Sequence, residues 1–300
     1  MLETFIIYQF EECSSMAEIN HKKIITDHQW LIFSETDNPD RHKRDSALAY
    51  QDSFLRYVLA LNDQRQTQAP FGILHFYPII QPTIYLGAKD KLLPQFPAAI
   101  QYLKESGYTV SLRPHGGLGV VEDSGILNFG LVTDNRIINL SIEEAYQVII
   151  DLVQDSLKKF SLQVNAYEIE DSYCPGKYDI VIDGKKVGGI AQRRFKNAVT
   201  TAAYIGVSGD QEQRGILMKE FYQKGDADQR FPNINPNSMT TLENIMGSNI
   251  QLEGYMQLLI DTFHQYSSTQ KGNYHDYTLK QIVQPLYQKA YQRSEKIQGQ

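Results

Sequence analysis

The sequence predicts an α+β fold in which mixed β-sheets are flanked by helices. Strand-like segments and segments with the spacing of amphipathic helices both occur along the 300 residues, without regular strand–helix–strand repeats. In addition, Asp183-Gly184 joins two runs that are rich in β-forming residues. An Asp-Gly pair in that position favours a hairpin with a type I′ turn, and hairpins build the antiparallel pairs that are typical of α+β sheets.

The expected strands are rich in β-branched and aromatic residues and are bounded by turn-forming residues. In chain order they cover 30–33, 72–77, 83–87, 108–113, 126–132, 178–182, 185–194 and 200–207. The run at 108–113 alternates apolar and polar residues most clearly, as expected of a strand with one buried face.

The expected helices repeat apolar residues every three or four positions. One begins at Asp45, others cover 95–106 and 141–160, and helix dominates from about residue 211 onward. The helix at 141–160 has the strongest start signal, because Ser141 is followed three residues later by Glu144, the pattern of a capping box.

The chain divides into three expected parts. Residues 1–27 form an N-terminal lead-in, residues 28–250 form the main domain, and residues 251–300 form a helical C-terminal extension. The N-terminus lacks the basic and apolar regions of a signal peptide, and no stretch approaches the roughly 18 apolar residues that a membrane span needs. We therefore expect a cytoplasmic protein that does not insert into a membrane.

Composition excludes several classes of function. The net charge is −6, so the chain as a whole is not attracted to phosphate backbones, and we expect no nucleic-acid partner. Its two cysteines, Cys13 and Cys174, are far apart and form neither a disulfide framework nor part of a metal-binding cluster. We expect free thiols in a reducing compartment and no metal.

Cys174 is the first candidate catalytic residue. Pro175-Gly176 makes a turn directly after it, so the cysteine lies in a loop just before a strand. A loop can present a thiol to a cleft, where a nearby cation would favour the nucleophilic thiolate. The alternative is a small buried apolar residue, which is the commonest role of a free cysteine.

Lys186 is the candidate cation. It follows the Asp183-Gly184 turn and precedes Gly188-Gly189, where glycines allow a ligand or another backbone to approach closely. The alternative is an ordinary solvated hairpin lysine, the role we expect for Lys185. Simple strand pairing places Lys186 opposite Val181, so it can meet Cys174 only if the chain before the strand folds back.

The loop at 113–119 is rich in glycine and follows a strand. Successive backbone N–H groups in such a loop can bind an anion or a carbonyl oxygen, although a tight structural turn is an equal alternative. Its spacing does not match a phosphate-binding loop, which ends in Gly-Lys-Ser or Gly-Lys-Thr. His115 in this loop is a candidate general base.

Together these motifs resemble a known family. The Arg113–Gly119 loop resembles the Arg-x-x-Gly-Gly signature of lipoate-protein ligases, and Gly184–Gln192 is similar to that family's second motif, whose lysine would be Lys186. The resemblance covers roughly residues 28–250. Ser172–Gly176, with Cys174 twelve residues before Lys186, and Leu118 in place of a third glycine resemble the octanoyl-[glycine cleavage H protein]:protein N-octanoyltransferase branch.

The resemblance implies a fold like the catalytic domain of biotin and lipoate-protein ligases, and an acyltransferase that needs neither ATP nor another cofactor. Cys174 would take an octanoyl or lipoyl group from a lysine of the glycine cleavage H protein as a thioester. A lysine of the lipoyl domains of 2-oxoacid dehydrogenase E2 subunits would then receive it. Lys186 would favour the thiolate and contact the acyl carbonyl.

The resemblance also implies a set of residues that contact the acyl substrate. They are Arg113, His115, Gly116, Gly117, Leu118, Gly119, Asn128, Gly189 and Ala191. Glu122-Asp123 departs from the His-Asp of many ligases, as do His115 and Gly119 from the residues usual at their positions. For docking of acidic carriers we expect Arg193, Arg194 and Lys196 to supply positive charge.

Two other functions remain open on the sequence. An ATP-dependent lipoate-protein ligase would make an acyl-adenylate and would not depend on Cys174. A non-enzymatic protein on the same fold would bind lipoyl carriers without exchanging acyl groups. Octanoyl and lipoyl groups are both apolar chains, so the sequence does not choose between them.

Overall fold

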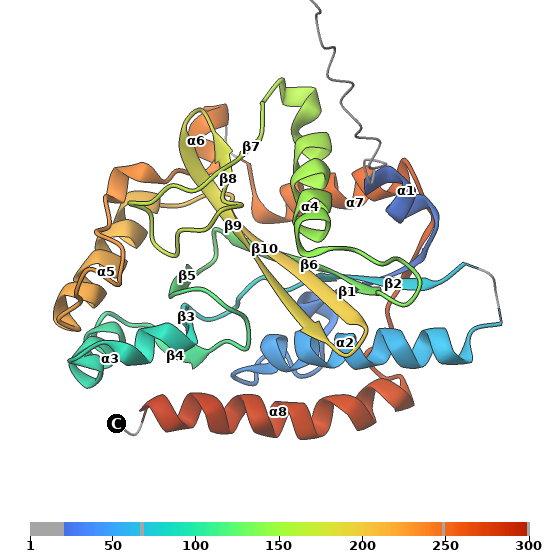
Figure 1. The fold of residues 1–300 in the computed structure, drawn as a ribbon, viewed down its shortest axis with the longest axis horizontal. Coiled ribbons are helices and arrows are strands. Elements are labelled where there is room, and N and C mark those ends of the chain that lie inside the picture. Colours follow the sequence, from blue (N-terminus) through green and yellow to red (C-terminus); the bar gives the residue numbers. More distant parts are fainter. Residues whose placement is uncertain (1–20, 67–68, 248–249, 299–300) are drawn as a thin grey trace, which may run out of the picture.

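The computed structural model describes residues 21–66, 69–247 and 250–298, and it contains two β-sheets surrounded by helices (Figure 1). Cys13 and most of the expected lead-in lie outside the described residues. The larger sheet has eight strands in the order β11-β1-β2-β6-β10-β9-β8-β7, and the smaller has three in the order β4-β3-β5. This arrangement confirms the expected α+β fold with mixed sheets.

The eight-stranded sheet is mostly antiparallel. Only β1 forms parallel pairs, one with β2 and one with β11. The strands are β1 (Gln29–Ser34), β2 (Phe71–Phe76), β6 (Ile126–Asp134), β7 (Asn165–Ala166), β8 (Ile180–Ile182), β9 (Lys185–Phe195), β10 (Ala198–Gly206) and β11 (Thr269–Lys271). Between β8 and β9, Asp183 and Gly184 both have positive φ, 50° and 76°, which confirms the expected type I′ hairpin.

The smaller sheet holds the loop that carries the first sequence motif. Its strands are β3 (Thr83–Leu86), β4 (Thr109–Leu112) and β5 (Val120–Glu122). Strand β3 pairs parallel with β4 and antiparallel with β5. The glycine-rich loop therefore connects the two outer strands of this sheet, and β3 lies between them.

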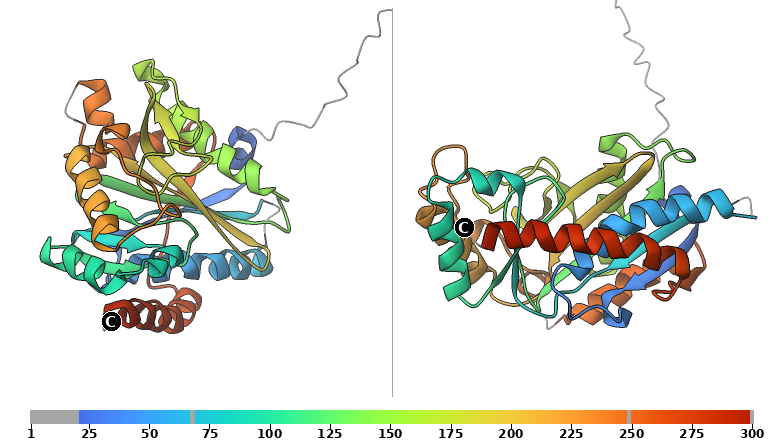
Figure 2. Two further views of the ribbon diagram at one scale, coloured as in Figure 1. Left: turned by 60° about the vertical axis from the view of Figure 1, so that its left-hand side comes forward. Right: turned by 90° about the horizontal axis from the view of Figure 1, so that it is seen from below.

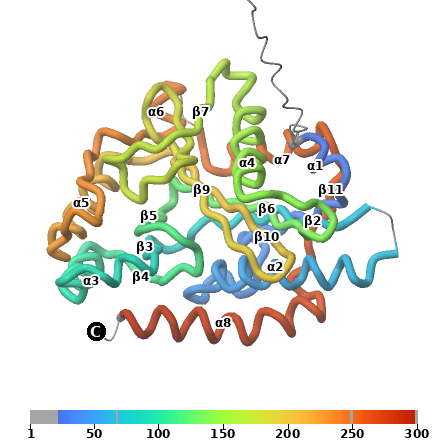
Figure 3. Tube along the Cα trace, viewed as in Figure 1, coloured from blue at the N-terminus to red at the C-terminus, as the bar shows by residue number. Residues whose placement is uncertain are grey.

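Helices cover both faces of the large sheet (Figure 3). On one face lie α1 (His21–Thr26), α4 (Ile142–Leu157) and α7 (Leu252–His264), and on the other lie α2 (Ser46–Gln64) and α8 (Tyr277–Gln298). Helices α3 (Phe96–Glu105) and α5 (Gln211–Lys224) pack with the small sheet. The remaining helical segments are α6 (Leu242–Met246) and the short 3₁₀ turns η1 (Glu35–Asp37), η2 (Ala88–Leu92), η3 (Lys158–Phe160) and η4 (Pro236–Ser238).

The two faces of the large sheet follow from strand alternation. Ile73 and Val132 join the core with α2 and α8, whereas their neighbours Leu74 and Leu131 join the core with α4 and α7. Successive side chains on a strand point to opposite faces, so each strand contributes to both cores. Every residue of β6 and β10 is buried, so both faces of these strands are covered by other parts of the fold.

The sequence predicted the long elements and missed the short ones. Helix α4 has the expected capping box, in which the Glu144 N–H donates to Ser141 Oγ at 3.1 Å and the Ser141 N–H donates to Glu144 Oε2 at 2.7 Å. The sequence did not predict β5, β7 or β11, because two or three residues are too few to establish an alternating pattern.

The C-terminal segment is integrated with the rest of the fold. It contains the expected helices α7 and α8, but β11 between them adds a strand at the edge of the large sheet beside β1. Helix α8 runs along α2 and ends near α3 (Figure 2). Across the described ranges, we find no helix whose length and hydropathy would suit a membrane crossing.

Candidate active site

A cavity of about 250 Å³ lies where the two sheets meet. Strands β6, β9 and β10 of the large sheet, β3 and β5 of the small sheet, and helix α2 all contribute lining residues. The loops at 113–117 and 174–179 complete the lining. The volume is just below the roughly 300–1,000 Å³ that is common for sites of drug-sized ligands, so the cavity suits a slim substrate.

Small residues on the large sheet make room for this cavity. Gly189 pairs with Tyr204, and Ala191 pairs with Ala202, so the four residues lie on one face of β9 and β10. Asn128 on β6 pairs with Tyr204 from the other side and also lines the cavity. A Cβ atom at Gly189 would lie 2.9 Å from the Tyr204 ring, so a larger residue there would displace the ring.

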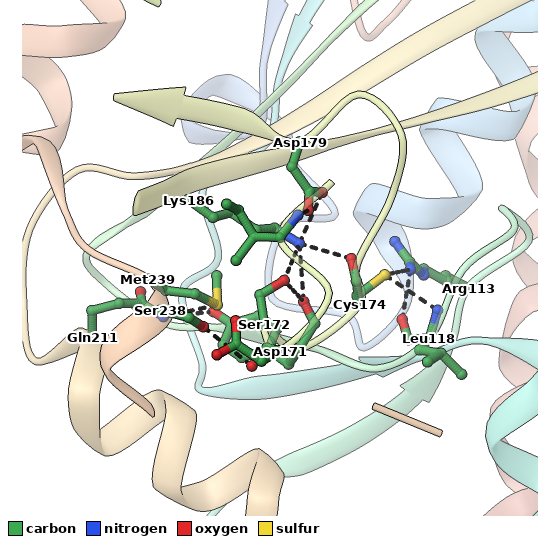
Figure 4. Close-up of polar contacts among 12 residues, drawn as sticks. Arg113, Leu118, Asp171, Ser172, Cys174, Asp179, Lys186, Gln211, Ser238 and Met239 are labelled. Atoms are coloured by element: carbon green, nitrogen blue, oxygen red, sulfur yellow. Dashed lines mark hydrogen bonds and ion pairs between the residues drawn. The ribbon is translucent and has the colours of Figure 1, made fainter. Parts of the chain in front are cut away.

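Cys174 projects its sulfur toward two hydrogen-bond donors (Figure 4). Its Sγ accepts from Arg113 Nη2 at 3.2 Å and from the Leu118 backbone N–H at 3.2 Å. The cysteine is partly buried and lines the cavity, and its φ of 48° is in the left-handed region that few residues other than glycine adopt. The sulfur therefore faces the cavity with one cationic side chain and one backbone N–H group beside it.

Arg113 is the cation at the sulfur. Burial alone would lower its pKa, but the Cys174 sulfur and the carboxyl groups of Asp90 and Glu122 raise the pKa overall, so the guanidinium stays charged. Its Nη2 also donates to the Leu118 carbonyl at 2.6 Å, which fixes the guanidinium between the loop and the sulfur. We expected Arg113 to bind substrate, and no sequence motif indicated its contact with Cys174.

Two glycines shape the loop around this contact. Gly117 has a φ of 96°, and a Cβ atom there would lie 2.6 Å from Arg113 Nη2 and 3.0 Å from the Cys174 sulfur. A Cβ atom at Gly87, at the end of β3, would lie 1.9 Å from the Gly117 carbonyl oxygen. The loop can therefore bring Arg113 and the Leu118 N–H to the sulfur only with glycine at both positions.

Lys186 contacts the backbone around Cys174 and not its sulfur (Figure 4). As expected, it lies opposite Val181, and the chain before β8 folds back to meet it. Its Nζ donates to the Cys174 carbonyl at 2.7 Å, to the Tyr173 carbonyl at 3.0 Å and to Ser172 Oγ at 3.1 Å. The described contacts thus differ from our expectation of a lysine ammonium facing the thiol.

A buried ion pair completes the surroundings of Lys186. The side chain is fully buried, and its Nζ lies 3.0 Å from Oδ1 of Asp179, which is also buried. Burial raises the pKa of Asp179, and the Lys186 ammonium opposes that rise. An ammonium has three N–H groups and here has four acceptors, so its donors are fully used within the chain. In this arrangement Lys186 fixes the conformation of the cysteine loop.

Most of the other residues expected to contact substrate line the cavity. These are His115, Gly116, Gly117, Asn128, Gly189 and Ala191. Leu118 contributes its N–H to the sulfur, and Gly119 faces away, with its Cβ position 2.7 Å from Met218.

Burial and three nearby arginines lower the pKa of His115 to about 3, so the imidazole is neutral at pH 7 and too weakly basic for the general-base role we considered.

Glu122 is a site residue that sequence reasoning did not identify. It is buried, lines the cavity and accepts a hydrogen bond from Asn128 Nδ2. Burial raises the pKa of its carboxyl to about 8, so most of it is protonated at pH 7. The available signal was the acidic pair Glu122-Asp123 directly after the apolar pair Val120-Val121, but the sequence does not show that the first carboxyl group is buried.

The arginines that we expected to dock a partner interact with their own chain. Arg193 donates to Asp52 at 2.8 Å and to the Pro114 carbonyl at 3.2 Å. Arg194 donates to the carbonyls of Leu140 and Ser141 at 2.9 and 2.8 Å. The two side chains lie on opposite faces of β9, as strand alternation predicted, and neither guanidinium is left without a partner.

Comparison with known proteins identifies the family of this fold. Residues 45–264 match the family model described as the lipoyl protein ligase A/B catalytic domain. The chain belongs to this family. The match includes the small sheet, all strands of the large sheet except β1 and β11, and the segments that carry Arg113, Cys174 and Lys186. It confirms the family resemblance predicted from the two motifs.

Curated relatives indicate the class of enzyme. The chain is 39% identical over 191 residues to a lipoyl-[GcvH]:protein N-lipoyltransferase of Listeria monocytogenes, covering 62% of this chain and 69% of the relative. It is 32% identical over 214 residues to an octanoyl-[GcvH]:protein N-octanoyltransferase of Oceanobacillus iheyensis, covering 70% of this chain and 75% of the relative. The protein is an acyltransferase of this family.

A solved structure supports the fold. A putative lipoate protein ligase of Thermoplasma acidophilum with bound lipoic acid has a TM-score of 0.62 to this chain at 20% sequence identity. The alignment covers 90% of this chain and 99% of that protein. The lipoate-protein-ligase-like fold expected from the sequence is therefore confirmed, including the helical C-terminal segment.

The contact between Arg113 and Cys174 can be tested by alkylation. We expect Arg113→Gln to slow the reaction of Cys174 with iodoacetamide at pH 7 by roughly tenfold, because the sulfur loses its cationic partner. Mass spectrometry of the peptide that contains Cys174 separates this reaction from that of Cys13. Arg230→Gln, which removes an exposed arginine paired with Asp228, should leave the rate unchanged. Equal rates in wild type and Arg113→Gln would contradict the assignment.

Glu122 should make folding stability depend on pH. Its carboxyl has a pKa of about 8 in the folded protein and an ordinary value of 4.5, so the folded state holds a proton that the unfolded state releases between these values. The free energy of unfolding therefore falls as pH rises from about 4.5 to 8. In urea unfolding, we expect Glu122→Gln to be more stable than wild type at pH 8.5 by a few kcal/mol, with the difference shrinking at pH 5. A difference independent of pH would refute this assignment.

Lys186 should prove to be a positioning residue. Lys186→Met leaves the Asp179 carboxylate buried without its partner, so we expect a loss of about 3–5 kcal/mol in the free energy of unfolding. Adding Asp179→Asn should restore much of that stability, but alkylation of Cys174 should stay slow because the cysteine loop has lost its three contacts with Nζ. A double variant that reacts as fast as wild type would contradict this role.

Proposed function

We propose that this acyltransferase moves an octanoyl or lipoyl chain between carrier proteins through a thioester on Cys174. The donor is a lysine of the glycine cleavage H protein, and the acceptor is a lysine of the lipoyl domains of 2-oxoacid dehydrogenase E2 subunits. The observation that carries this proposal is the Cys174 sulfur, held by Arg113 and the Leu118 N–H at the wall of a slim cavity. The names of the two relatives, a lipoyl-[GcvH]:protein N-lipoyltransferase and an octanoyl-[GcvH]:protein N-octanoyltransferase, support the same donor.

The first half-reaction forms the thioester. The Cys174 thiolate attacks the carbonyl carbon of the acyl-lysine amide, and the C–N bond breaks as the C–S bond forms. The departing nitrogen needs a proton to leave as a neutral amine. Glu122 lines the same cavity and carries a proton at pH 7, so its carboxyl is the group we assign to this transfer.

The second half-reaction reverses these steps on another carrier. The amine of the acceptor lysine attacks the thioester carbonyl, and the sulfur leaves as a thiolate that returns to Arg113 and the Leu118 N–H. The proton from the new amide nitrogen goes to the Glu122 carboxylate, which restores the starting state. Donor and acceptor bonds are both lysine amides, so the net reaction is close to balanced in free energy and needs no ATP.

The shape of the site suits this sequence of steps. Splitting an amide exchange into two acyl transfers to and from sulfur lowers each barrier. The small residues Gly189, Ala191 and Ala202 leave room for an acyl chain between the sheets. Water must be kept out while the thioester exists, and a narrow cavity filled by the chain serves that purpose.

The decisive experiment is to trap the thioester. We expect wild-type protein mixed with octanoylated H protein, without ATP, to carry an octanoyl adduct on Cys174 that hydroxylamine removes. Cys174→Ala should lose the adduct and at least about a thousandfold of the transfer rate, since removal of a nucleophile removes the covalent route.

Three outcomes of this experiment would contradict the proposal. Full transfer by Cys174→Ala would exclude the thioester. Transfer that occurs only with ATP and free fatty acid would instead indicate an ATP-dependent ligase. Binding of the H protein without any acyl exchange would indicate a non-enzymatic carrier-binding protein.

A further inference from the structure

A second hollow, a cleft of about 680 Å³, lies on the other side of the Arg113–His115 loop from the acyl cavity. Helix α8 forms one wall, and the η2 turn with the end of β4 forms the other. Its lining carries five Lys or Arg residues and His115 but no carboxylate. The basic residues are Lys91, Arg113, Lys289, Arg293 and Lys296. We call this hollow the basic cleft.

Three lysines in the basic cleft are available to a partner. Lys91, Lys289 and Lys296 are exposed, and none forms a hydrogen bond or ion pair through its ammonium with any residue in the described ranges. Arg193 and Arg194, in contrast, already bond within the chain. In a protein with a net charge of −6, an acid-free cluster of unpaired ammonium groups is a local exception.

Helix geometry explains the cluster on α8. Lys289, Arg293 and Lys296 follow one another at spacings of four and three residues, so they lie on one face of the helix. The acidic Glu295 lies off this face and pairs with Arg44 at 2.5 Å. The α8 face toward η2 is therefore basic over about 10 Å of helix length.

The walls of the basic cleft are fixed in place. Ser294 on α8 accepts a hydrogen bond from the Leu112 N–H at 3.1 Å and donates to Asp45 at 3.0 Å. Ile297 packs into the core of the small sheet. On the opposite wall, buried Asp90 accepts from Tyr222 at 2.9 Å, so the acidic residue of η2 faces inward while Lys91 is exposed.

The basic cleft is next to the acyl cavity, because the two share lining residues. Arg113 and His115 line both the basic cleft and the cavity that contains Cys174. A macromolecule seated over the basic cleft would therefore lie next to the cavity. Exposed charges spread along a helix suit a protein surface, whereas a tight site for a small anion is usually built from converging backbone N–H groups.

We propose that the basic cleft docks the carboxylate-bearing face of the carrier protein whose acyl-lysine enters the Cys174 cavity. This inference rests on the proposed function and identifies where on the enzyme the carrier binds. Lys91, Lys289 and Lys296 attract the carrier, and the shared wall at Arg113 and His115 directs its lysine toward the sulfur. Exposed charges at the rim of an interface mainly change the rate at which two proteins associate and how strongly that rate depends on salt concentration.

The test compares two charge reversals in the basic cleft with one elsewhere on the same helix. The variant Lys289→Glu/Lys296→Glu removes the attraction, and Lys280→Glu is the matched control, because Lys280 is exposed on α8 and nine residues from Lys289, which places it on the opposite face. Each protein is titrated with unacylated H protein and a lipoyl domain in the Cys174→Ala background, and transfer kinetics are measured with Cys174 intact.

We expect the double variant to raise Kd and KM for the carriers by roughly 5- to 30-fold with little change in kcat, and to flatten the dependence of kcat/KM on salt. Lys280→Glu should behave as wild type. Acylation of Cys174 by p-nitrophenyl octanoate, which needs no carrier, should be the same in all three proteins and shows that the site is intact.

The possible failures can be told apart. Carrier Kd values that are unchanged in the double variant, or changed equally by Lys280→Glu, would overturn the docking proposal while leaving the thioester chemistry standing. Loss of ATP binding in the double variant with unchanged carrier Kd would assign the basic cleft to a nucleotide. If carriers bind tightly through the basic cleft but the wild-type protein transfers no acyl group, the proposed function is wrong and the docking proposal still holds.

Discussion

The hydrogen bonds from Arg113 and the Leu118 N–H to the Cys174 sulfur are the contact on which the proposed chemistry depends. A thiol is a weak nucleophile until something favours its anion, and here one full charge and one backbone dipole converge on it. The donors come from the small sheet and the sulfur from the chain before β8, so the contact exists only when both sheets are assembled. Gly117 leaves the space in which it forms.

The two cations near Cys174 have separate tasks. Arg113 faces the sulfur, whereas Lys186 is buried beneath the loop and bonds to its carbonyls and to Asp179. Burying the charged ammonium of Lys186 costs free energy, because the ammonium loses its contacts with water. Its ion pair with Asp179 offsets that cost. The backbone at Cys174 has a φ of 48°, a strained conformation that persists only when its surroundings hold it. Lys186 supplies that restraint.

The sequence allowed much of this to be predicted, and the remainder depends on contacts between distant segments. The Asp183-Gly184 hairpin and the capping box of α4 are local, so residue pattern alone identified them. Motif spacing placed Cys174 and Lys186 in one site but could not say which atoms meet. Arg113 lies 61 residues from Cys174, and only the assembled fold shows their contact. Glu122 was not predicted as a site residue. Its raised pKa results from burial, and residue spacing in the sequence does not reveal that burial.

The position of β11 has a consequence for biosynthesis. One edge of β1 pairs with β2 about forty residues later, but the other is covered only by Thr269–Lys271, near the end of the chain. Until the ribosome releases that segment, β1 presents an unpaired edge, the feature through which nascent chains associate wrongly. The large sheet can therefore close at this edge only after the segment that contains β11 has been synthesised.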